Sequence, residues 1–409
     1  MYEVGIMTNF KKPTELAAMI ALISKSYGID IIYMTPKDVN IEEQKIDGKV
    51  MVDNKWVDKK TDIPSFIDAS VYCFKEENNE VMDYLRKTTF LSDTRENRIS
   101  KEKLQKVLKD DEKFAHLIIP THKLDTFNEL YLNLIAYNKV VIKPENGIKG
   151  KGIYSVEKVG DDTFKIGYKR NKWNVHLDGL KSYFDEILKQ KSYILQKYIA
   201  SKTPQGDPFD IRIHVERDRS GKWSIAKIYV RIGIGQSVVS NVSQGGGVSE
   251  PVAFLKAFYG DKWETIYSNL VTIGKTLPKK MEKLRKTHIM YLGIDIGIES
   301  NGDLYLFETN DGPGTKNVIS EAAFHRSNYY AYVMKEKLNY PVKQLVDVIE
   351  DDQHKIAQLE IANSQLETAV SKETKKTAIK EKQIQDMINS TSWKVTGFLR
   401  KAKKLVKKN

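Results

Sequence analysis

The chain has 409 residues, of which 41% are hydrophobic, so it can bury one or two cores and is expected to form two or three domains. Its first ten residues lack a basic, apolar leader pattern, and no apolar run is long enough to span a bilayer, so we expect a cytoplasmic protein rather than a secreted or membrane-spanning one. A single cysteine, Cys73, excludes an intramolecular disulfide and a cysteine-based zinc site.

The formal net charge of +12 is unevenly distributed. Residues 391–409 hold seven Lys or Arg and no acidic residue, so most of the excess belongs to this tail. Since no recognised nucleic-acid-reading motif accompanies the charge, nucleic-acid binding ranks last among the functions considered.

Residues 1–92 are predicted to form a small α/β domain, because short apolar runs alternate with one helical pattern. The expected elements are a strand over 2–7, a helix over 14–28, a strand over 30–36, a hairpin over 48–60 that turns at Asp53 and Asn54, and a strand over 69–74. A helix from Ser100 to Leu108 and a strand over 116–124, broken by Pro120, follow.

The stretch VVIKPENGIKGKGIYSVEK, residues 140–158, combines three glycines and four lysines with two flanking β-branched runs. Backbone N–H groups of such a turn can point at phosphate oxygens, and Lys143 supplies a positive charge on the preceding strand. The stretch does not match a Walker loop or the dinucleotide fingerprint, and a simple hairpin turn is the alternative.

Three more segments place charged residues on predicted strands. SYILQKYIA is an apolar strand pattern that leads into Gln196–Ile199. FDIRIHVER alternates Asp210, Arg212 and His214 on one face. The segment 227–251 carries Arg231, Asn241 and three consecutive glycines. Each of these segments could instead be the exposed face of a sheet.

The segment LGIDIGIESNGDLYLFETNDGPG, residues 292–314, predicts a hairpin that turns at Asn301 and Gly302. Glu308 and Asn310 lie two residues apart on one face of its second strand, and Asp295 can approach both from the first strand. Two carboxylates and an amide oxygen are hard ligands suited to Mg²⁺ that bridges substrate phosphates, whereas the alternative is an ordinary surface hairpin.

After Pro341 the composition becomes polar and helical. With Leu345 at position d and Ile349 at position a, a heptad pattern places Ile356, Asn363 and Val370 at a and Leu359 and Leu366 at d. The pattern predicts a coiled-coil helix over 343–390 that pairs two copies of the chain, and the alternative is a single solvated helix. The basic tail 391–409 can form an amphipathic helix on an anionic membrane surface or remain a frayed basic end.

Taken together, these segments resemble the ATP-grasp superfamily, and the endospore-coat-associated ATP-grasp group is the most similar. The resemblance covers about residues 93–325 and rests on the order of the motifs. It implies an α+β ATP-grasp domain over 93–340, in which two α+β subdomains clasp ATP and Mg²⁺, or Mn²⁺ in its place. The 1–92 domain would precede it, and the coiled-coil helix would follow it.

The resemblance also implies a role for each matching residue. Lys143 would contact the α- and β-phosphates, and residues 146–152 would close over the triphosphate, while the segment 196–199 would hold adenine through the backbone of Lys197 and Ile199. Arg212 and Asn241 would approach the γ-phosphate, and Arg231 the substrate carboxylate or its acyl phosphate. The full expected set is Lys143, Asn146, Gly147, Gly150, Lys151, Gly152, Gln196, Lys197, Tyr198 and Ile199 for the nucleotide, Arg212, Arg231 and Asn241 for catalysis, and Asp295, Glu308 and Asn310 for the metal.

Some positions depart from the family pattern. Gln196 stands where the family usually has glutamate, Lys101 and Lys103 compete for the role of an adenine-side lysine, and Asp207 is a candidate for the ribose contact.

The implied reaction is the ATP-dependent joining of a carboxylate and an amine through an acyl phosphate, which needs positioning and charge neutralisation rather than a nucleophilic side chain. A non-catalytic scaffold that dimerises through the coiled coil and an ATP-grasp phosphotransferase are the alternatives. The tail segment STSWKVTGFLR is similar to the ends of many bacterial surface-polysaccharide proteins, with Gly397 where proline is common. This second resemblance implies work on envelope glycans at the inner face of the cell membrane.

Overall fold

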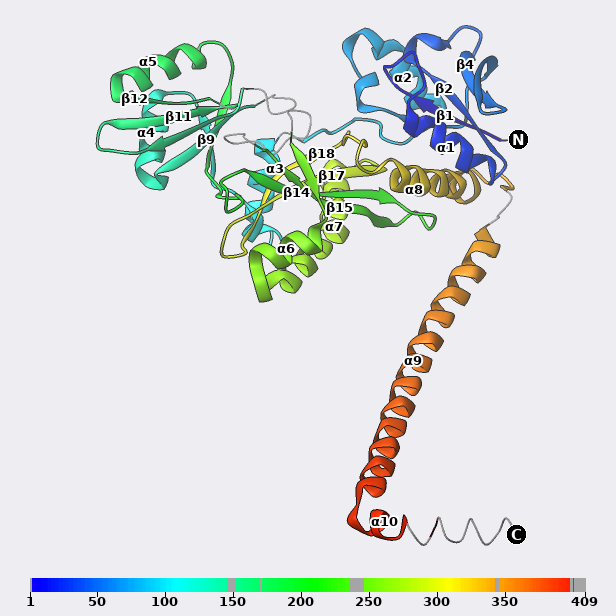
Figure 1. Cartoon of the computed structure of the whole chain (residues 1–409). Coiled ribbons are helices and arrows are strands. Elements are labelled where there is room, and N and C mark those ends of the chain that lie inside the picture. The colour runs from blue at the N-terminus through cyan, green and yellow to red at the C-terminus, as the bar shows by residue number, and fades with distance from the viewer. Residues whose placement is uncertain are drawn as a thin grey trace. The chain divides into compact units, whose positions relative to one another are not determined.

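The computed structural model describes residues 2–99, 101–145, 152–169, 171–234, 246–342, 346–397 and 400 (Figure 1). The chain divides into two compact units, Met1–Lys343 and Gln344–Asn409. None of the helices in the described ranges combines the length and the apolar character needed to cross a lipid bilayer.

The N-terminal sheet is built on parallel strands in the order β2-β1-β6-β7, with β4 joined antiparallel to β2. Its elements are β1 (Tyr2–Met7), α1 (Glu15–Lys25), β2 (Ile29–Met34), β3 (Val39–Asn40), β4 (Lys45–Val52), β5 (Lys55–Asp62), β6 (Phe66–Ala69), α2 (Asn79–Thr88) and β7 (Phe90–Leu91). The predicted first strand and helix are confirmed, and Thr14 caps the helix by accepting a hydrogen bond from the N–H of Ala17. The hairpin turn at Asp53 and Asn54 is also confirmed, with both residues in the left-handed region that such a turn requires.

Two strand predictions in this part of the chain are wrong in extent. The strand expected over 69–74 ends as β6 at Ala69, where Ser70 accepts a hydrogen bond from the N–H of Tyr72 and opens a 3₁₀ turn that buries Cys73. The strand expected over 116–124 is limited to β8 (Thr121–Leu124), because Pro120 lacks the N–H of a ladder residue and the preceding apolar residues form a 3₁₀ turn. In both runs a 3₁₀ turn replaces part of the expected strand, and these turns bury Cys73 and Leu117.

The second sheet has the strand order β12-β11-β10-β9-β13-β8. Its elements are α4 (Phe127–Tyr137), β9 (Lys139–Pro144), β10 (Tyr154–Lys158), β11 (Thr163–Tyr168), β12 (Asn171–His176), α5 (Leu177–Leu188) and β13 (Tyr193–Lys197), together with β8. Helices α4 and α5 cover the sheet through a core that includes Leu130, Phe164 and Phe184. The predicted strands on either side of the glycine-rich stretch are therefore confirmed as β9 and β10.

The third sheet carries the predicted polar residues and has the order β16-β15-β14-β17-β18. Its elements are α3 (Lys101–Lys109), β14 (Phe209–Arg217), β15 (Trp223–Ile232), β16 (Gly247–Ser249), α6 (Pro251–Tyr259), α7 (Trp263–Arg285), β17 (Tyr291–Ile298) and β18 (Leu304–Asn310). One face of the sheet packs into a large apolar core with α7, which includes Ile213, Leu270 and Ile294. The predicted hairpin of β17 and β18 is confirmed, and Gly302 in its turn has φ +96°.

Helix α8 (Ile319–Tyr332) joins the N-terminal sheet to the third sheet, since it packs against α1 and against β14 (Figure 1). Its buried face is polar as well as apolar. Arg326 donates to both carboxylate oxygens of Glu216 on β14, and Tyr330 donates to Asp68 on β6 at 2.6 Å. Buried charges therefore link elements more than 100 residues apart.

The second unit consists of the long helix α9 (Val346–Asn389) and the short α10 (Thr391–Val395). The described heptad residues of α9 are solvent-exposed, with Leu359, Leu366 and Val370 each more than 60% accessible. Leu345 and residues 401–409 of the predicted tail lie outside the described residues, and the side chain of Ile349 is likewise not described. The helix is confirmed, and its pairing with a second copy stays a prediction.

Candidate functional site

The face of the third sheet that lies opposite its apolar core is lined by charged side chains. Alternation along β14 puts Ile211 and Ile213 in the core, and therefore puts Asp210, Arg212 and His214 on the other face, as the sequence predicts. These three residues are nevertheless buried, each at 5% accessibility or less. The alternative of an ordinary solvent-exposed sheet face does not hold for these residues.

The two candidate catalytic arginines are neutralised by two aspartates. Arg231 donates to both carboxylate oxygens of Asp210 at 2.6 Å and lies 2.9 Å from Asp295. Arg212 donates to both oxygens of Asp295 through its Nε and its Nη2, the latter at 3.0 Å. Burial alone would raise the pKa of Asp295, but the guanidinium groups of Arg231 and Arg212 hold that pKa below its ordinary value. Asp295 therefore stays ionised between two cations.

Glu308 and Asn310 face this group from the neighbouring strand. Asp295 is directly opposite Glu308 in the β17–β18 ladder, and Asn310 lies opposite Gly293. The Nδ2 of Asn310 donates to Glu308 Oε1 at 3.0 Å, which leaves the amide oxygen directed to other donors or to a cation. The three predicted metal ligands thus share one face of one hairpin.

A β-bulge in β18 makes this register, because Ile296 pairs with Leu306 whereas Asp295 pairs with Glu308. The extra residue is Phe307. A Cβ atom on Gly297 would lie 2.1 Å from the Phe307 ring, so the ring covers that glycine on the charged side of the sheet. Phe307 and Glu308 are consecutive residues on the same face, which simple alternation does not predict.

The donor set fits Mg²⁺ in chemistry, since it offers two carboxylates and one amide oxygen on paired strands. Within the described ranges no three His, Cys, Asp or Glu side chains gather into a metal-binding group, so the remaining ligands would have to be phosphate oxygens or water. Asp295 is shared with two arginines, and a bound cation would compete with them for its oxygens. We expect the cation to enter together with an anion that pairs with the arginines, as the phosphates of a nucleoside triphosphate would.

Lys143 and Lys197, which are predicted to contact the nucleotide, lie on the second sheet. The Lys143 ammonium on β9 lies 5.6 Å from the centre of the Phe307 ring, and the Lys197 ammonium on β13 lies 5.8 Å from that of Tyr305. Gly152 has φ +77° where the chain returns to β10, so this position favours glycine. The other residues expected in the loop, Asn146, Gly147, Gly150 and Lys151, and the expected Asn241, lie outside the described residues.

The predicted adenine segment has its backbone groups partly engaged. The N–H of Lys197 donates to the Pro120 carbonyl at 3.1 Å, and the carbonyl of Ile199 accepts from the N–H of Ser201 at 2.9 Å. An adenine edge would therefore meet the Lys197 carbonyl and the Ile199 N–H. Gln196 is buried and donates from Nε2 to Thr121 Oγ1 at 2.8 Å. Of the competing lysines, Lys103 lies on α3, and the side chain of Lys101 is not described.

A second charged cluster, which the sequence did not reveal, adjoins the three predicted metal ligands Asp295, Glu308 and Asn310, called the metal set below. It joins Asp93 and Arg95, in the segment that follows β7, to Arg285 at the end of α7 and Asp311 directly after Asn310. No spacing rule links positions 93, 285 and 311. The sequence shows only that these residues are charged, and this does not predict that they lie together.

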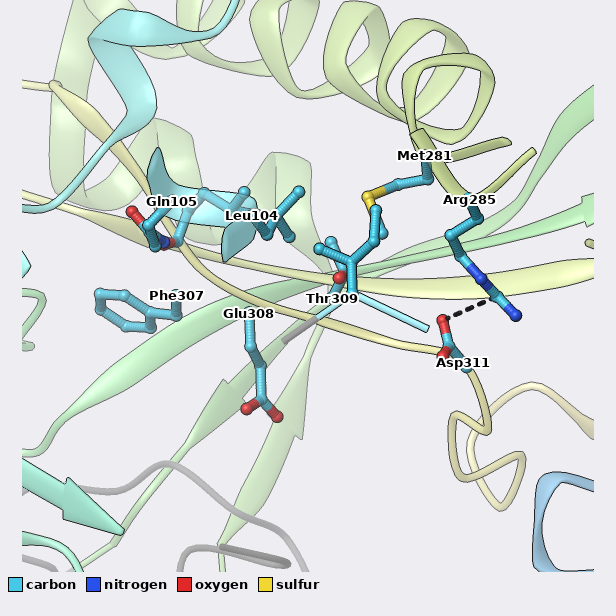
Figure 2. Close-up of a pocket in the computed structure, with 10 residues that line it drawn as sticks. Leu104, Gln105, Met281, Arg285, Phe307, Glu308, Thr309 and Asp311 are labelled. Carbon is cyan, nitrogen blue, oxygen red and sulfur yellow. Dashed lines mark hydrogen bonds and ion pairs between the residues drawn. The ribbon is translucent and has the colours of Figure 1, made fainter. Parts of the chain in front are cut away.

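A small cavity of about 50 Å³ lies between this cluster and β18, and Figure 2 shows residues that line it. Gln105, Met281, Arg285 and Thr309 line it, while the Glu308 carboxylate is directed away from Met281 and Arg285. The Nε of Arg285 and the Oε1 of Gln105 are buried and have no hydrogen-bond partner among the described residues. The cavity is large enough for a few water molecules that would satisfy both atoms.

Comparisons with known proteins agree with the motif order. The profile of the YheC/D-like ATP-grasp family matches residues 91–342. The endospore coat-associated protein YheD of Bacillus subtilis (strain 168) is 25% identical over 356 residues, covering 82% of this chain and 77% of that protein. Endospore coat-associated protein YheC of the same strain is 21% identical over 353 residues, covering 82% of this chain and 95% of that protein.

Among solved structures, a RiPP-associated ATP-grasp ligase of Chryseobacterium gregarium, in complex with ADP and a leader and core peptide, aligns with a TM-score of 0.45 and 14% identity, over 85% of this chain and all of that one. An N5-carboxyaminoimidazole synthetase of Staphylococcus aureus complexed with ADP aligns with a TM-score of 0.47 and 12% identity, over 80% of this chain and 77% of that one.

Proposed function

Because the chain belongs to the YheC/D-like ATP-grasp family, and is on that ground an ATP-dependent carboxylate-amine ligase with Mg²⁺ as its metal, we propose that it transfers the γ-phosphoryl group of ATP to a substrate carboxylate. The carboxylate oxygen attacks the γ-phosphorus and ADP leaves, which gives an acyl phosphate. An amine then attacks the acyl carbon and loses a proton, phosphate leaves, and an amide or peptide bond forms.

The observation that carries this proposal is the buried row of Arg231, Asp295 and Arg212 opposite Glu308 and Asn310. Two guanidinium groups are fixed beside two carboxylates and an amide oxygen, and no histidine or cysteine among the described residues joins the row. Phosphoryl transfer between oxygens needs this kind of fixed charge more than it needs a general base.

Each residue then has a task. Arg212, together with Asn241, would bind the γ-phosphate, and Arg231 would bind the substrate carboxylate or its acyl phosphate. Asp295, Glu308 and Asn310 would hold Mg²⁺, which neutralises phosphate charge when bound.

On the second sheet, Lys143 would contact the α- and β-phosphates, and residues 146–152 would cover them. The segment Gln196–Ile199 would hold adenine through the Lys197 carbonyl and the Ile199 N–H.

The finer proposal concerns where the reaction takes place. The basic tail and its similarity to the ends of surface-polysaccharide proteins support a carboxyl-bearing envelope glycan as a substrate, at the inner face of the bacterial membrane. The exposed apolar positions of α9 support a homodimer. Deleting residues 343–409 should release the protein from the membrane fraction and change glycan composition in the host, and an unchanged fraction and composition would refute this part.

The reaction itself is tested by calorimetry of ATP binding with and without Mg²⁺. We expect Glu308→Ala combined with Asn310→Ala to abolish the magnesium-dependent part of ATP binding. Asp185→Ala, which removes an exposed carboxylate from α5 on another sheet, is the matched control and should bind as the wild type does. Hydroxylamine should then trap the acyl phosphate when a carboxylate substrate is present. A wild-type protein that binds no ATP in the presence of Mg²⁺ would overturn the proposal.

A further inference from the structure

Four charged side chains next to the metal set form a closed square of alternating sign, made of Asp93, Arg285, Asp311 and Arg95. Arg285 Nη2 donates to Asp93 at 2.8 Å, and Arg285 Nη1 lies 3.5 Å from Asp311. Arg95 Nη1 donates to Asp311 at 2.7 Å and lies 3.4 Å from Asp93. Each carboxylate therefore contacts both guanidinium groups, and the four charges cancel.

The square is buried, which makes each corner depend on the others. Side-chain accessibility is 1% for Arg285, 7% for Arg95 and 9% for Asp93, and rises to 23% at Asp311. Removing one member of a buried ion group leaves its partner charged and unpaired away from water. The geometry at each corner is thus tied to the geometry at the other three.

The backbone at Arg95 is adapted to this role. Arg95 has φ +60°, an uncommon left-handed conformation for a long side chain, and its N–H donates to Asp93 Oδ1 at 2.7 Å. This turn directs the guanidinium group of Arg95 toward Asp311. Strained residues of this kind persist where the surrounding contacts hold them in place.

The square holds in place the chain segment that follows the predicted metal ligand Asn310. Asp311 follows Asn310 directly, and Gly312 packs so closely on Val71 that a Cβ atom there would lie 2.6 Å from a Val71 methyl group. Figure 2 shows the Asp311 carboxylate directed toward Arg285 on the side of β18 away from the Glu308 carboxylate. The segment is therefore held from α7, from the segment that follows β7 and from the N-terminal domain.

We propose that Asp93, Arg95, Arg285 and Asp311 are positioning residues that fix Asn310 beside Glu308 and so set the affinity of the site for Mg²⁺. This inference rests on the proposed function. It adds that the metal set depends on the segment between the N-terminal domain and α3, so that a change at Arg95 reaches the metal through Asp311. These residues touch neither metal nor nucleotide in this account.

The test uses Asp311→Asn in the full-length chain, because this corner is the most exposed and the change keeps the side-chain shape. Partners that orient metal ligands typically alter metal affinity by about 10–100-fold when mutated, so we expect the Mg²⁺ concentration needed for half-maximal ATP binding to rise about tenfold. ATP affinity at saturating Mg²⁺ should change little. Arg95→Lys, which keeps the charge, should give a smaller rise and serves if Asp311→Asn folds poorly.

Arg217→Gln is the matched control, since it breaks an ion pair to Glu282 on the same helix as Arg285 without touching the square. Hydrogen exchange of residues 310–316 supplies a readout that needs no nucleotide, and exchange there should be faster in Asp311→Asn than in the control. If wild type and control bind ATP with Mg²⁺ and Asp311→Asn matches them in magnesium requirement and in exchange, the inference is wrong. If the wild type binds no ATP, the proposed function fails, and unchanged exchange in Asp311→Asn would overturn the square as well.

Discussion

Two glycines in the site matter because they lack a side chain where neighbouring groups come close. Gly293 lies opposite Asn310, and a Cβ atom there would be 3.1 Å from Arg212 Nη1 and 2.8 Å from Pro313 Cβ. Gly297 makes room for the Phe307 ring in the same way. The two glycines on either side of Asp295 on β17 therefore allow the arginine and the bulged strand to approach.

Gly293→Ala should weaken ATP binding, because the added methyl group would displace Arg212 from Asp295. Overpacking of a close-packed site typically costs about 1–3 kcal/mol, so we expect a loss of stability of that size together with a lower ATP affinity. Calorimetry and thermal unfolding measure the two effects. Gly314→Ala is the control, since nothing lies within 4 Å of the atom that it adds. Equal behaviour of the two variants would show that the approach at Gly293 has no consequence.

At the level of residues, the sequence predicted which side chains share a face but not their partners. The alternation in β14 and the spacing in the β17–β18 hairpin placed Arg212, Asp295, Glu308 and Asn310 correctly. Period-two alternation is a local pattern, so it predicts to which face of the sheet each side chain points. It could not show that Asp295 binds both arginines, because Arg212 and Asp295 are 83 residues apart. It also could not separate a buried charged face from an exposed one, since the same pattern serves both.

Among the elements, long periodic segments were predicted best and short apolar runs worst. The α9 helix and the strands around the glycine-rich stretch have patterns that fit one structure. The runs near Val71 and Leu117 are equally apolar but end in 3₁₀ turns. A run of four or five apolar residues fits either a strand or a packed turn, and tertiary contacts decide between them.

The apolar positions of α9 predict association of two copies. Leu359→Glu with Leu366→Glu places charges at two d positions and should shift the protein from dimer to monomer in sedimentation equilibrium, because like charges would face each other in the seam. The single change Ile361→Glu is a control, since this residue is equally exposed but lies at position f, outside the seam. A wild-type protein that sediments as a monomer at all concentrations would contradict the prediction.

For the whole molecule, buried polar contacts join the N-terminal sheet to the third sheet. Asp68 on β6, Glu216 on β14 and Arg326 on α8 come from three separate regions of the chain. His214 lies beside them, 2.9 Å from Glu216, and is fully buried. None of these contacts follows from a local pattern, so the arrangement of the domains was not predictable from the sequence although their fold was.

Three histidines couple the stability of the whole fold to pH. Burial lowers the pKa of His214 and His325 below its ordinary value, and lowers that of His288 to about 3. These groups stay neutral in the folded chain and take up protons once unfolded. Their contribution to stability is therefore complete above the ordinary histidine pKa of about 6.5 and is lost progressively as the pH falls below it.

We expect the free energy of unfolding to fall from pH 7 to pH 5, by up to about 1.4 kcal/mol per pH unit for each such histidine. Urea unfolding at each pH measures this slope. His288→Gln should flatten it by removing one proton-binding group from the unfolded chain, whereas His122→Gln, at an exposed position on β8, should leave it unchanged. A slope that is the same in wild type and His288→Gln would refute the assignment of His288.

The bulge at Phe307 makes the metal set depend on chain length. Without the bulge, the ladder that pairs Ile296 with Leu306 would continue and place Phe307 opposite Asp295. Glu308 and Asn310 would then point into the apolar core, with Phe307 in the place of Glu308 and Thr309 in the place of Asn310 on the charged face. Losing the bulge while keeping every residue would thus turn both predicted ligands on this strand away from the charged face without altering either side chain. On this strand, the number of residues between two ladder pairs decides which side chains face the site, as much as the identity of those side chains does.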